Sequence, residues 1–359
     1  MPPRITNLDD IPSPYLLGLN DKFLNGDYKP LIETARGCPF ACTFCQQGED
    51  YYNKVRRFSF EVTKKELKYL AEKSKSKTLC LADSNFGTYK QDLVTAKEMA
   101  SLLKTHGFPS AVQGVNGKNN KERVIETTEI LGHTFFMAPI QSSNDEVLKN
   151  IKRKNISGQV MLDIVNRAKE KSQTATSFSE LILALPGETK ESHLKANGEL
   201  IDAGIDVVRS HQLIMLPASP MSYRKSRYEY GFVTKFRVVP DTIEQYELYG
   251  EKFYAPEIDE ICVQTNTLSF DDYIECRKYN LTVETFYNNG IFEELIKFLK
   301  RHDVKISTFV LNIHEKVKNS KLFAELYSNF VRETKELIFT ISKDTSLVFS
   351  LLSYCVEKS

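Results

Sequence analysis

Three cysteines lie within eight residues in the stretch Cys38-Pro39-Phe40-Ala41-Cys42-Thr43-Phe44-Cys45. This stretch directly follows an apolar, strand-like run at residues 31–35, and the next cysteine and the first histidine are Cys80 and His106. A structural zinc site is closed by four protein ligands, and no fourth ligand is nearby in the sequence. A [4Fe–4S] cluster bound by three cysteines instead leaves one iron open for another ligand. The spacing therefore predicts reactive iron rather than structural zinc.

The same eight residues resemble the signature of the radical S-adenosylmethionine (SAM) enzymes, including the aromatic residue before the last cysteine. The resemblance implies that Cys38, Cys42 and Cys45 hold a [4Fe–4S] cluster whose open iron is chelated by SAM. It also implies that Phe44 lies at the cofactor. An electron from a donor such as flavodoxin or ferredoxin would cleave SAM to methionine and a 5′-deoxyadenosyl radical. The alternative, incidental or buried cysteines, does not explain thiols this dense in a loop after a strand.

Composition is that of an ordinary globular protein, with 41% hydrophobic and 26% charged residues. The 359 residues leave room for one large α/β domain and a smaller one. The 48 Lys and Arg residues balance the 47 Asp and Glu residues, so bulk charge does not indicate a polyanionic partner. With no apolar run of about 18 residues and no basic-then-apolar leader, we expect neither a membrane span nor a secretory signal. The cysteines do not resemble a disulfide framework, which favours a reducing cytoplasm, and the isolated Cys262, Cys276 and Cys355 are expected to be buried thiols.

Short β-like runs alternate with amphipathic helical stretches between Pro30 and Leu216, the pattern of parallel βαβ units. An eight-unit barrel takes about 250 residues, so the roughly 187 residues here correspond to about six units. We therefore expect an α/β fold built on a partial (β/α)6 TIM-like barrel with a lateral mouth. The candidate strands are 31–35, 78–82, 111–114, 134–138, 178–184 and 207–214, and the candidate helices are 61–73, 93–105, 144–152, 160–171 and 191–203.

The chain is expected to divide into three parts. Residues 1–29, rich in Pro, Asn and Asp, predict an extended linker or cap, and residues 30–235 a radical SAM partial barrel. Residues 236–359 predict a mostly helical C-terminal domain, with apolar-periodic runs at 291–299, 322–331 and 347–355.

A basic and aromatic stretch lies at the junction of the last two parts. It carries Arg224, Lys225, Arg227, Lys235 and Arg237 against one acid, Glu229, with tyrosines and phenylalanines between them. Such a stretch can bind nucleic acid by charge and stacking. We favour a solvated connector, because the net charge of the chain is near zero.

The N-terminal segment offers a second resemblance. Ile11-Pro12-Ser13-Pro14-Tyr15, Pro30 and Glu33-Thr34-Ala35-Arg36-Gly37 are similar to the join between a cobalamin-binding domain and the radical core in cobalamin-dependent radical SAM proteins. Three interpretations stay open: the chain is a fragment, a partner chain supplies the cobalamin domain, or this member works without cobalamin. A domain supplied in trans would favour methyl transfer to carbon. Without it, rearrangement, oxidation and methylthiolation stay open.

The ends of the candidate strands hold the residues that chemistry would use, because barrel enzymes act on their βα loops. After the second strand, the resemblance assigns Asp83 and Asn85 to the SAM amino group, and an ordinary Asx turn is the alternative. After the fourth strand, it assigns Gln141 and Ser142 to the SAM ribose and carboxylate. Ser143 is expected to cap the next helix, because Glu146 follows at capping-box spacing.

Three further positions complete the candidate site. Arg153 matches an arginine that reaches the SAM carboxylate in some relatives, with a solvated basic helix end as the alternative. Gly187, in a turn after the fifth strand, resembles the turn that packs against adenine. His211, on the sixth strand, shares a face with Arg209 and could contact substrate or donate a proton, although we favour a satisfied structural histidine.

The sequence thus predicts a radical SAM enzyme that takes hydrogen from an unidentified substrate, with no catalytic residue assigned. Two alternatives belong to other classes. An electron-transfer iron–sulfur protein would want a fourth cysteine. A zinc- or iron–sulfur-binding nucleic-acid interaction protein without SAM chemistry would bind RNA or DNA in a strongly salt-dependent manner.

Overall fold

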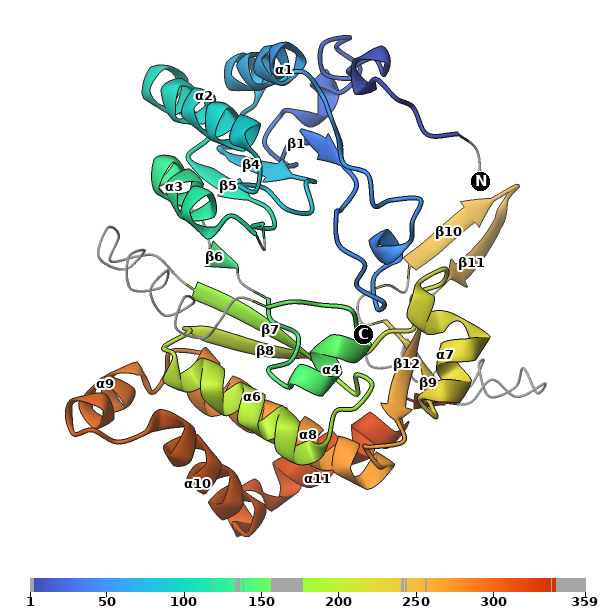
Figure 1. Cartoon of the computed structure of the whole chain (residues 1–359), viewed down its shortest axis with the longest axis vertical. Helices are drawn as coiled ribbons and strands as arrows, with labels where there is room; N and C mark the ends of the chain where they lie inside the picture. Colours follow the sequence, from blue (N-terminus) through green and yellow to red (C-terminus); the bar gives the residue numbers. More distant parts are fainter. Residues whose placement is uncertain are drawn as a thin grey trace.

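Two parallel three-stranded sheets form the centre of the computed structural model (Figure 1). The structure describes residues 3–117, 119–132, 136–137, 139–155, 177–239, 242, 244–255, 257–336 and 338–339. The strands are β1 (Leu31–Ile32), β4 (Thr78–Leu81), β5 (Ala111–Gln113), β6 (Phe136–Met137), β7 (Ser177–Leu183) and β8 (Val207–Gln212). Their orders, β1-β4-β5 and β6-β7-β8, follow the chain, as right-handed βαβ units require.

The two sheets form a partial, TIM-like barrel, and every predicted strand is found in it. Among the described residues, no strand pairing joins β5 to β6. The described barrel therefore consists of two halves of three strands each. The count of six βα units stays a prediction, because the predicted helix 160–171 lies outside the described residues.

Helices cover the outer faces of both sheets (Figure 1). They are α1 (Phe60–Lys73), α2 (Lys90–His106) and α3 (Lys121–Leu131) on the first sheet, and α6 (Lys190–Asp202) and α8 (Phe270–Val283) on the second. The short α4 (Asp145–Asn150) follows β6. Helix α3 was not predicted, because Lys, Glu and Thr dilute its pattern and its buried residues are Val124 and Thr127.

Each sheet buries its own apolar core. Leu67 of α1 and Met99 of α2 pack with Leu79 of β4 on the first sheet. On the second, Leu181 of β7 and Val208 of β8 pack against the layer of α6, α8 and α10 (Ile306–Lys318). Burial of such large side chains supplies the main free energy that holds helices on a sheet.

The second sheet continues into the C-terminal part of the chain. Beyond β8, Ile214 forms an antiparallel bridge with Ile261 of β12 (Ile258–Gln264), and the Cys262 amide donates to the Leu213 carbonyl over 2.8 Å. Strand β12 pairs with β9 (Val233–Val238), which pairs with β13 (Ile338–Phe339). The predicted boundary at residue 235 therefore falls inside β9.

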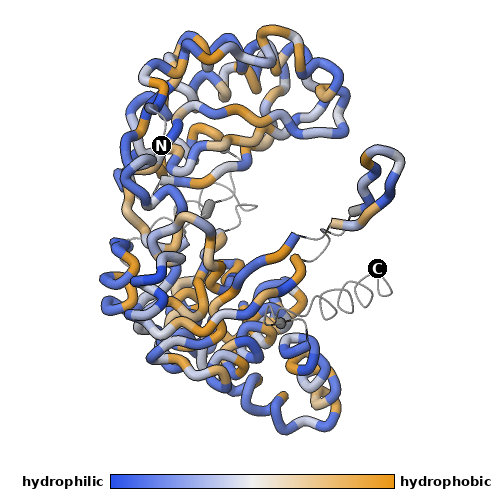
Figure 2. The backbone as a smooth tube through the Cα atoms, turned by 90° about the vertical axis from the view of Figure 1, so that its right-hand side faces the viewer, coloured by the Kyte–Doolittle hydropathy of each residue, from blue (hydrophilic) through white to orange (hydrophobic). Residues whose placement is uncertain are grey.

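The expectation of a mostly helical C-terminal domain is wrong for residues 236–264, where the structure has strands. Residues 261–263 are buried consecutively, so β12 shows neither the alternation of an edge strand nor a helical period. Strands β10 (Glu244–Leu248) and β11 (Glu251–Ala255) form a hairpin that projects from the body of the chain (Figure 2).

The remaining C-terminal elements are helical. They are α9 (Glu293–Arg301), α10 and α11 (Lys321–Glu336), which confirm the predictions at 291–299 and 322–331. The predicted helix 347–355 lies outside the described residues. None of the helices in the described ranges is both long and apolar enough to cross a membrane.

The N-terminal segment, predicted as an extended linker or cap, packs against the first half of the barrel. It contains two short 3-10 helices, Leu8–Asp10 and Asp21–Phe23, and buries Leu8, Tyr15 and Leu24. The Tyr15 hydroxyl lies 3.0 Å from both the amide nitrogen and the carbonyl oxygen of Leu31, so the segment is tied to β1.

Candidate cofactor site

The three cysteines lie in a loop that two short strands close. The predicted strand 31–35 breaks after Ile32, and the chain then forms β2 (Ala35–Arg36), which pairs antiparallel with β3 (Arg56–Arg57). Inside the loop, the Cys38 amide donates to the Tyr52 carbonyl over 3.0 Å, and the Cys45 amide donates to the Cys42 carbonyl over 3.1 Å. The backbone therefore sets the path of the loop around its thiols.

Two glycines allow this loop to fold onto itself. Gly37 has φ of +104°, and a Cβ there would lie 2.8 Å from the carbonyl oxygens of Tyr52 and Lys54. A Cβ on Gly48 would lie 2.1 Å from the Cys42 carbonyl oxygen, closer than any real contact. Only glycine fits at either position, so the close wrapping depends on both.

The cysteine loop also connects the two halves of the barrel. The Thr43 amide donates to the Ile151 carbonyl over 3.1 Å, and the Met221 amide donates to the Thr43 carbonyl over 2.9 Å. Phe44 is partly buried and packs against the apolar cluster that contains Leu183 and Leu213. The contact between Phe44 and the cofactor stays a prediction. The described residues show that Phe44 packs in this apolar cluster.

Asn85 reaches the first cysteine. Its Nδ2 donates to Cys38 Sγ over 3.2 Å, and its buried Oδ1 has no hydrogen-bond partner among the described residues. Asp83, two residues earlier, instead accepts from Thr34, over 2.7 Å from the amide and 2.5 Å from the hydroxyl. Burial raises the pKa of the Asp83 carboxyl, and the Thr34 hydrogen bonds oppose that shift. Asp83 thus joins the ends of β1 and β4.

A buried ion pair that the sequence did not reveal supports this loop. Arg57 pairs with Asp92, which is fully buried, and its guanidinium also lies 3.3 Å from the Thr34 hydroxyl. The other Asp92 oxygen accepts from the amides of Gly87 and Tyr89, each over 2.9 Å. An aspartate in the first turn of a helix is typical of a cap, so nothing in the sequence marked it as a support for the site.

Gln141 and Ser142 follow β6 in the second half-barrel, where Gln141 bridges to Leu181 of β7, and their contacts with SAM stay predictions. Gln141 has φ of +68°, and its amide donates to the Glu180 carbonyl over 2.8 Å. Ser142 is buried, and its hydroxyl lies 3.4 Å from Glu188 Oε1. The predicted capping role of Ser143 is wrong, because Asn144 caps α4 by accepting from the amides of Glu146 and Val147.

Arg153 is buried beside the cysteines. It is 6% exposed, so the alternative of a solvated helix end is wrong. Its Nε donates to Asn155 Oδ1 over 2.8 Å and its Nη2 to the Pro139 carbonyl, whereas its buried Nη1 has no partner among the described residues. Burial lowers the pKa of the guanidinium, and the nearby Cys42 and Cys38 sulfurs act in the opposite direction.

Gly187 forms a tight turn against α4. It has φ of +88°, and a Cβ there would lie 2.9 Å from Asn150 Nδ2, which donates to the Pro186 carbonyl over 3.1 Å. Glu188, next in the chain, is completely buried with one oxygen 3.7 Å from His193 Nδ1. Because Glu188 Oε1 lies 3.4 Å from the Ser142 hydroxyl, the turn at Gly187 lies next to Ser142.

His211 lies on the inner face of the second half-barrel. In the parallel register, Arg209 pairs with Glu180 and His211 with Ile182, while Leu181 and Val208 face the helices. His211 Nε2 lies 3.2 Å from Glu180 Oε1, yet the His211 side chain is 48% exposed. It is thus partnered, as predicted for a structural histidine, and still accessible to a molecule inside the barrel.

The basic stretch at 223–237 is partly neutralised. Arg227 forms a two-pronged ion pair with Glu260 at 2.5 and 2.7 Å, and Arg237 pairs with Asp259 at 3.2 Å. These pairs anchor α7 (Arg224–Glu229) and β9 to β12, which agrees with the connector interpretation.

The six cysteines that the structure describes are all free thiols. Cys262 and Cys276 are buried as predicted, and burial raises the pKa of Cys262 to about 12. Cys355 lies outside the described residues. Across the described part of the chain, no three His, Cys, Asp or Glu side chains are arranged to hold a single metal ion. A cubane cluster makes a different demand, because each cysteine binds a different iron.

Comparison with known proteins agrees with this geometry. The Radical SAM superfamily profile matches residues 32–197, which include the cysteine loop and the turn at Gly187. The chain belongs to the radical SAM superfamily. Members of this family bind a [4Fe–4S] cluster and SAM.

Two curated relatives match nearly the whole radical SAM chain. The 2-(S-pantetheinyl)-carbapenam-3-carboxylate methyltransferase of Streptantibioticus cattleyicolor is 30% identical over 329 residues, 85% of this chain and 46% of that protein. The cobalamin-dependent radical SAM methyltransferase TokK of Streptomyces tokunonensis is 29% identical over 320 residues, 84% of this chain and 44% of that protein. The chain thus spans less than half the length of these relatives.

A solved structure is also similar. The radical SAM methyltransferase TsrM of Kitasatospora setae, with cobalamin and a [4Fe–4S] cluster bound, is 14% identical with a TM-score of 0.49. The alignment covers 62% of this chain and 40% of that one.

Proposed function

We propose that this chain is the SAM-cleaving part of a cobalamin-dependent radical SAM methyltransferase that transfers a methyl group to carbon. The observation that carries the proposal is a pair of buried polar atoms beside the cysteines that have no hydrogen-bond partner among the described residues. Asn85 Oδ1 lies on the side chain that donates to Cys38, and Arg153 Nη1 lies on the guanidinium next to Cys42. Burying a polar atom without a partner costs about 1–3 kcal/mol, and because these two lie beside Cys38 and Cys42, a ligand bound at the cysteines would complete them.

The residues present fit a cluster with SAM on its open iron. Cys38, Cys42 and Cys45 would hold three irons, on a loop whose backbone hydrogen bonds are already made. The hydrogen bond from Asn85 Nδ2 to Cys38 Sγ would stabilise the thiolate and contribute to the reduction potential of the cluster.

The two unpartnered atoms match the two ends of an amino acid. Asn85 Oδ1 is an acceptor and would bind the ammonium of SAM, with Asp83 as the nearby carboxylate. Arg153 Nη1 is a donor and would bind the carboxylate of SAM. Gln141 and Ser142 would contact the ribose and carboxylate, and the turn at Gly187 the adenine. Bound together, the cluster and SAM supply the 5′-deoxyadenosyl radical, while the chain positions the cofactors and excludes water.

The assignment of methyl transfer rests on the relatives. Both long matches are named methyltransferases, and one is named cobalamin-dependent. We propose that the cobalamin is held outside residues 1–359, by a further segment or a partner chain, and that flavodoxin or ferredoxin delivers the electron. Residues 30–235 would form the catalytic barrel, with residues 1–29 as its cap.

The test is anaerobic iron–sulfur reconstitution, reduction with dithionite in the presence of SAM, and chromatography for 5′-deoxyadenosine. We expect about four irons per chain and release of 5′-deoxyadenosine. Both should be lost in Cys42→Ala and kept in the matched control Cys80→Ala, since Cys80 is a partly exposed thiol outside the loop. Bound zinc in place of iron, or a loaded cluster that never cleaves SAM with cobalamin and substrate candidates present, would contradict the proposal.

A further inference from the structure

A cavity of about 660 Å³ lies between α8 and α11 and is bordered by Lys318 of α10. It is on the outer side of the second sheet, beyond the helices that pack on Leu181 and Val208. The face that carries Glu180 and His211 is on the opposite side of that sheet. The cavity is therefore separate from the candidate cofactor site, and the radical chemistry proposed above makes no use of it.

The lining of the cavity carries an excess of positive charge. It contains Lys278 from α8, Lys318 from α10, and Arg332 and Lys335 from α11, with two carboxylates, Glu275 and Glu336. Glu315 adds a third carboxylate beside the lining, since it pairs with Lys318 at 3.1 Å, so four bases against three acids leave a net charge of about +1. The excess of positive charge favours an anion as the ligand.

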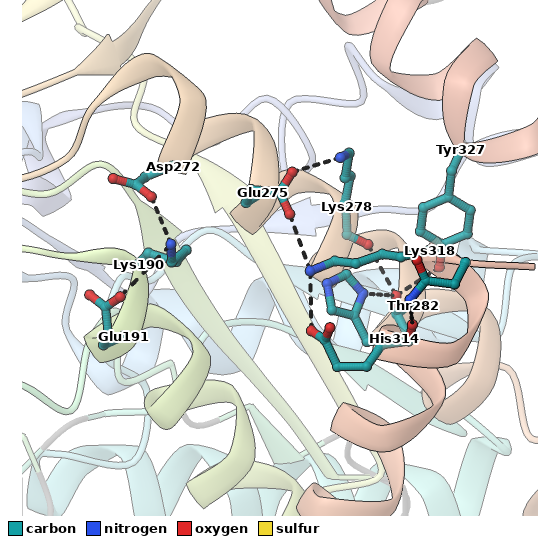
Figure 3. A network of polar contacts seen from close by, with 11 residues as sticks. Lys190, Glu191, Asp272, Glu275, Lys278, Thr282, His314, Lys318 and Tyr327 are labelled. Atoms are coloured by element: carbon teal, nitrogen blue, oxygen red, sulfur yellow. Dashed lines mark hydrogen bonds and ion pairs between the residues drawn. The ribbon is translucent and has the colours of Figure 1, made fainter. Parts of the chain in front are cut away.

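The four bases differ in what they already bind. Glu275 accepts from Lys278 at 2.6 Å and lies 3.3 Å from Lys318, so this acid bridges two bases (Figure 3). Arg332 and Lys335 make no ion pair or hydrogen bond with any residue that the structure describes. They lie three positions apart on α11, hence on one face of that helix. Their charges are available to a ligand.

The inner wall of the cavity is neutral and held in place. The Tyr327 hydroxyl lies 2.7 Å from Thr282 Oγ1, which lies 2.7 Å from His314 Nδ1 (Figure 3). Burial lowers the pKa of His314 to about 4, so the imidazole is uncharged at neutral pH and adds nothing to the positive charge. Tyr327, Ala324 and Val331 give this wall an apolar surface. A ligand with an organic part would be covered there.

We propose that this cavity binds a small phosphorylated molecule, with its phosphate at Lys318, Arg332 and Lys335 and its organic part against Tyr327 and Val331. Phosphate is an anion that suits this lining, because arginine binds its oxygens through two parallel N–H groups and lysine adds a point charge. The volume exceeds what phosphate alone would fill, which is why the organic part belongs to the proposal.

The experiment is isothermal titration of the full chain with phenyl phosphate and, in a second series, with inorganic phosphate. The test variant is Arg332→Gln with Lys335→Gln. The matched control is Lys316→Gln with Lys321→Gln, which removes the same charge from α10 and α11 outside the cavity. Thermal unfolding of each variant establishes that it is folded.

We expect phenyl phosphate to bind with one site per chain and more tightly than inorganic phosphate. The test variant should weaken that binding about tenfold or more, and the control should leave it unchanged. Absence of binding, or equal weakening by the test and control variants, would overturn the proposal. Neither result depends on a cluster or on SAM, so the outcome is separate from that of the proposed enzymatic function.

Discussion

The buried polar residues beside the cysteines and those that join α8 to α10 and α11 differ in whether their hydrogen bonds are made within the described chain. Thr282 of α8 hydrogen-bonds to both His314 of α10 and Tyr327 of α11, so these side chains satisfy one another. Beside the cysteines, Asn85 Oδ1 and Arg153 Nη1 are buried without a partner among the described residues. Because an unmade buried hydrogen bond is costly, the first group is a structural network, and the second group is where we propose that SAM binds.

The largest effect on this comparison is expected from Arg153→Met, which removes one of the two buried atoms that have no partner among the described residues. We expect SAM to bind about a hundredfold more weakly, because the SAM carboxylate would lose a buried, charged partner. The measurement is equilibrium binding of SAM to reconstituted protein with its iron content determined. Arg277→Met is the matched control, since Arg277 is a largely buried arginine that stacks over Phe330 far along the chain. An unchanged SAM affinity at full iron content would make Arg153 a purely structural residue.

Asp83→Ala tests a residue that belongs to the candidate cofactor site and already has hydrogen-bond partners within the chain. Its carboxylate already accepts two hydrogen bonds from Thr34, so removing it leaves a buried amide and hydroxyl unpaired. We expect the free energy of unfolding to fall by about 2 kcal/mol. Denaturant unfolding measures this, with exposed Glu325→Ala on α11 as the control. If the stability of Asp83→Ala equals that of the control, the proposed link between β1 and β4 is wrong.

A smaller change in the free energy of unfolding is expected from the titration of His314. Its pKa in the folded chain is about 4, below the usual value of 6.5, so the unfolded chain binds more protons between these values. Stability from this group is therefore complete above about pH 6.5 and is lost as the pH falls toward 4. Between about pH 7 and about pH 5.5 the loss should be about 1 kcal/mol.

The measurement for His314 is a comparison of denaturant unfolding of the natural chain and His314→Asn across this pH range. The difference in unfolding free energy between the two proteins should narrow as the pH falls. A difference that stays constant with pH would show that His314 titrates normally and does not belong to a closed network.

Local patterns predicted most of the elements, because periodicity and capping act over a few residues. The sequence placed a strand at 178–184 and a helix at 191–203, and the structure has β7 and α6 there within one residue. The strand expected at 31–35 broke because Thr34 binds Asp83 and Ala35 pairs with Arg57, contacts that lie far along the chain. Strand β12 was missed because both of its faces are buried, which removes the alternation.

By itself, the sequence determined the family and its cysteine loop, since the spacing of Cys38, Cys42 and Cys45 is a local property. Only the tertiary structure decided which polar side chains are already satisfied. It bound Asp83 to Thr34, buried Arg153 beside Cys42 and left one atom of Asn85 without a partner among the described residues. Burial and hydrogen bonding join residues from distant strands, and no spacing along the chain records them.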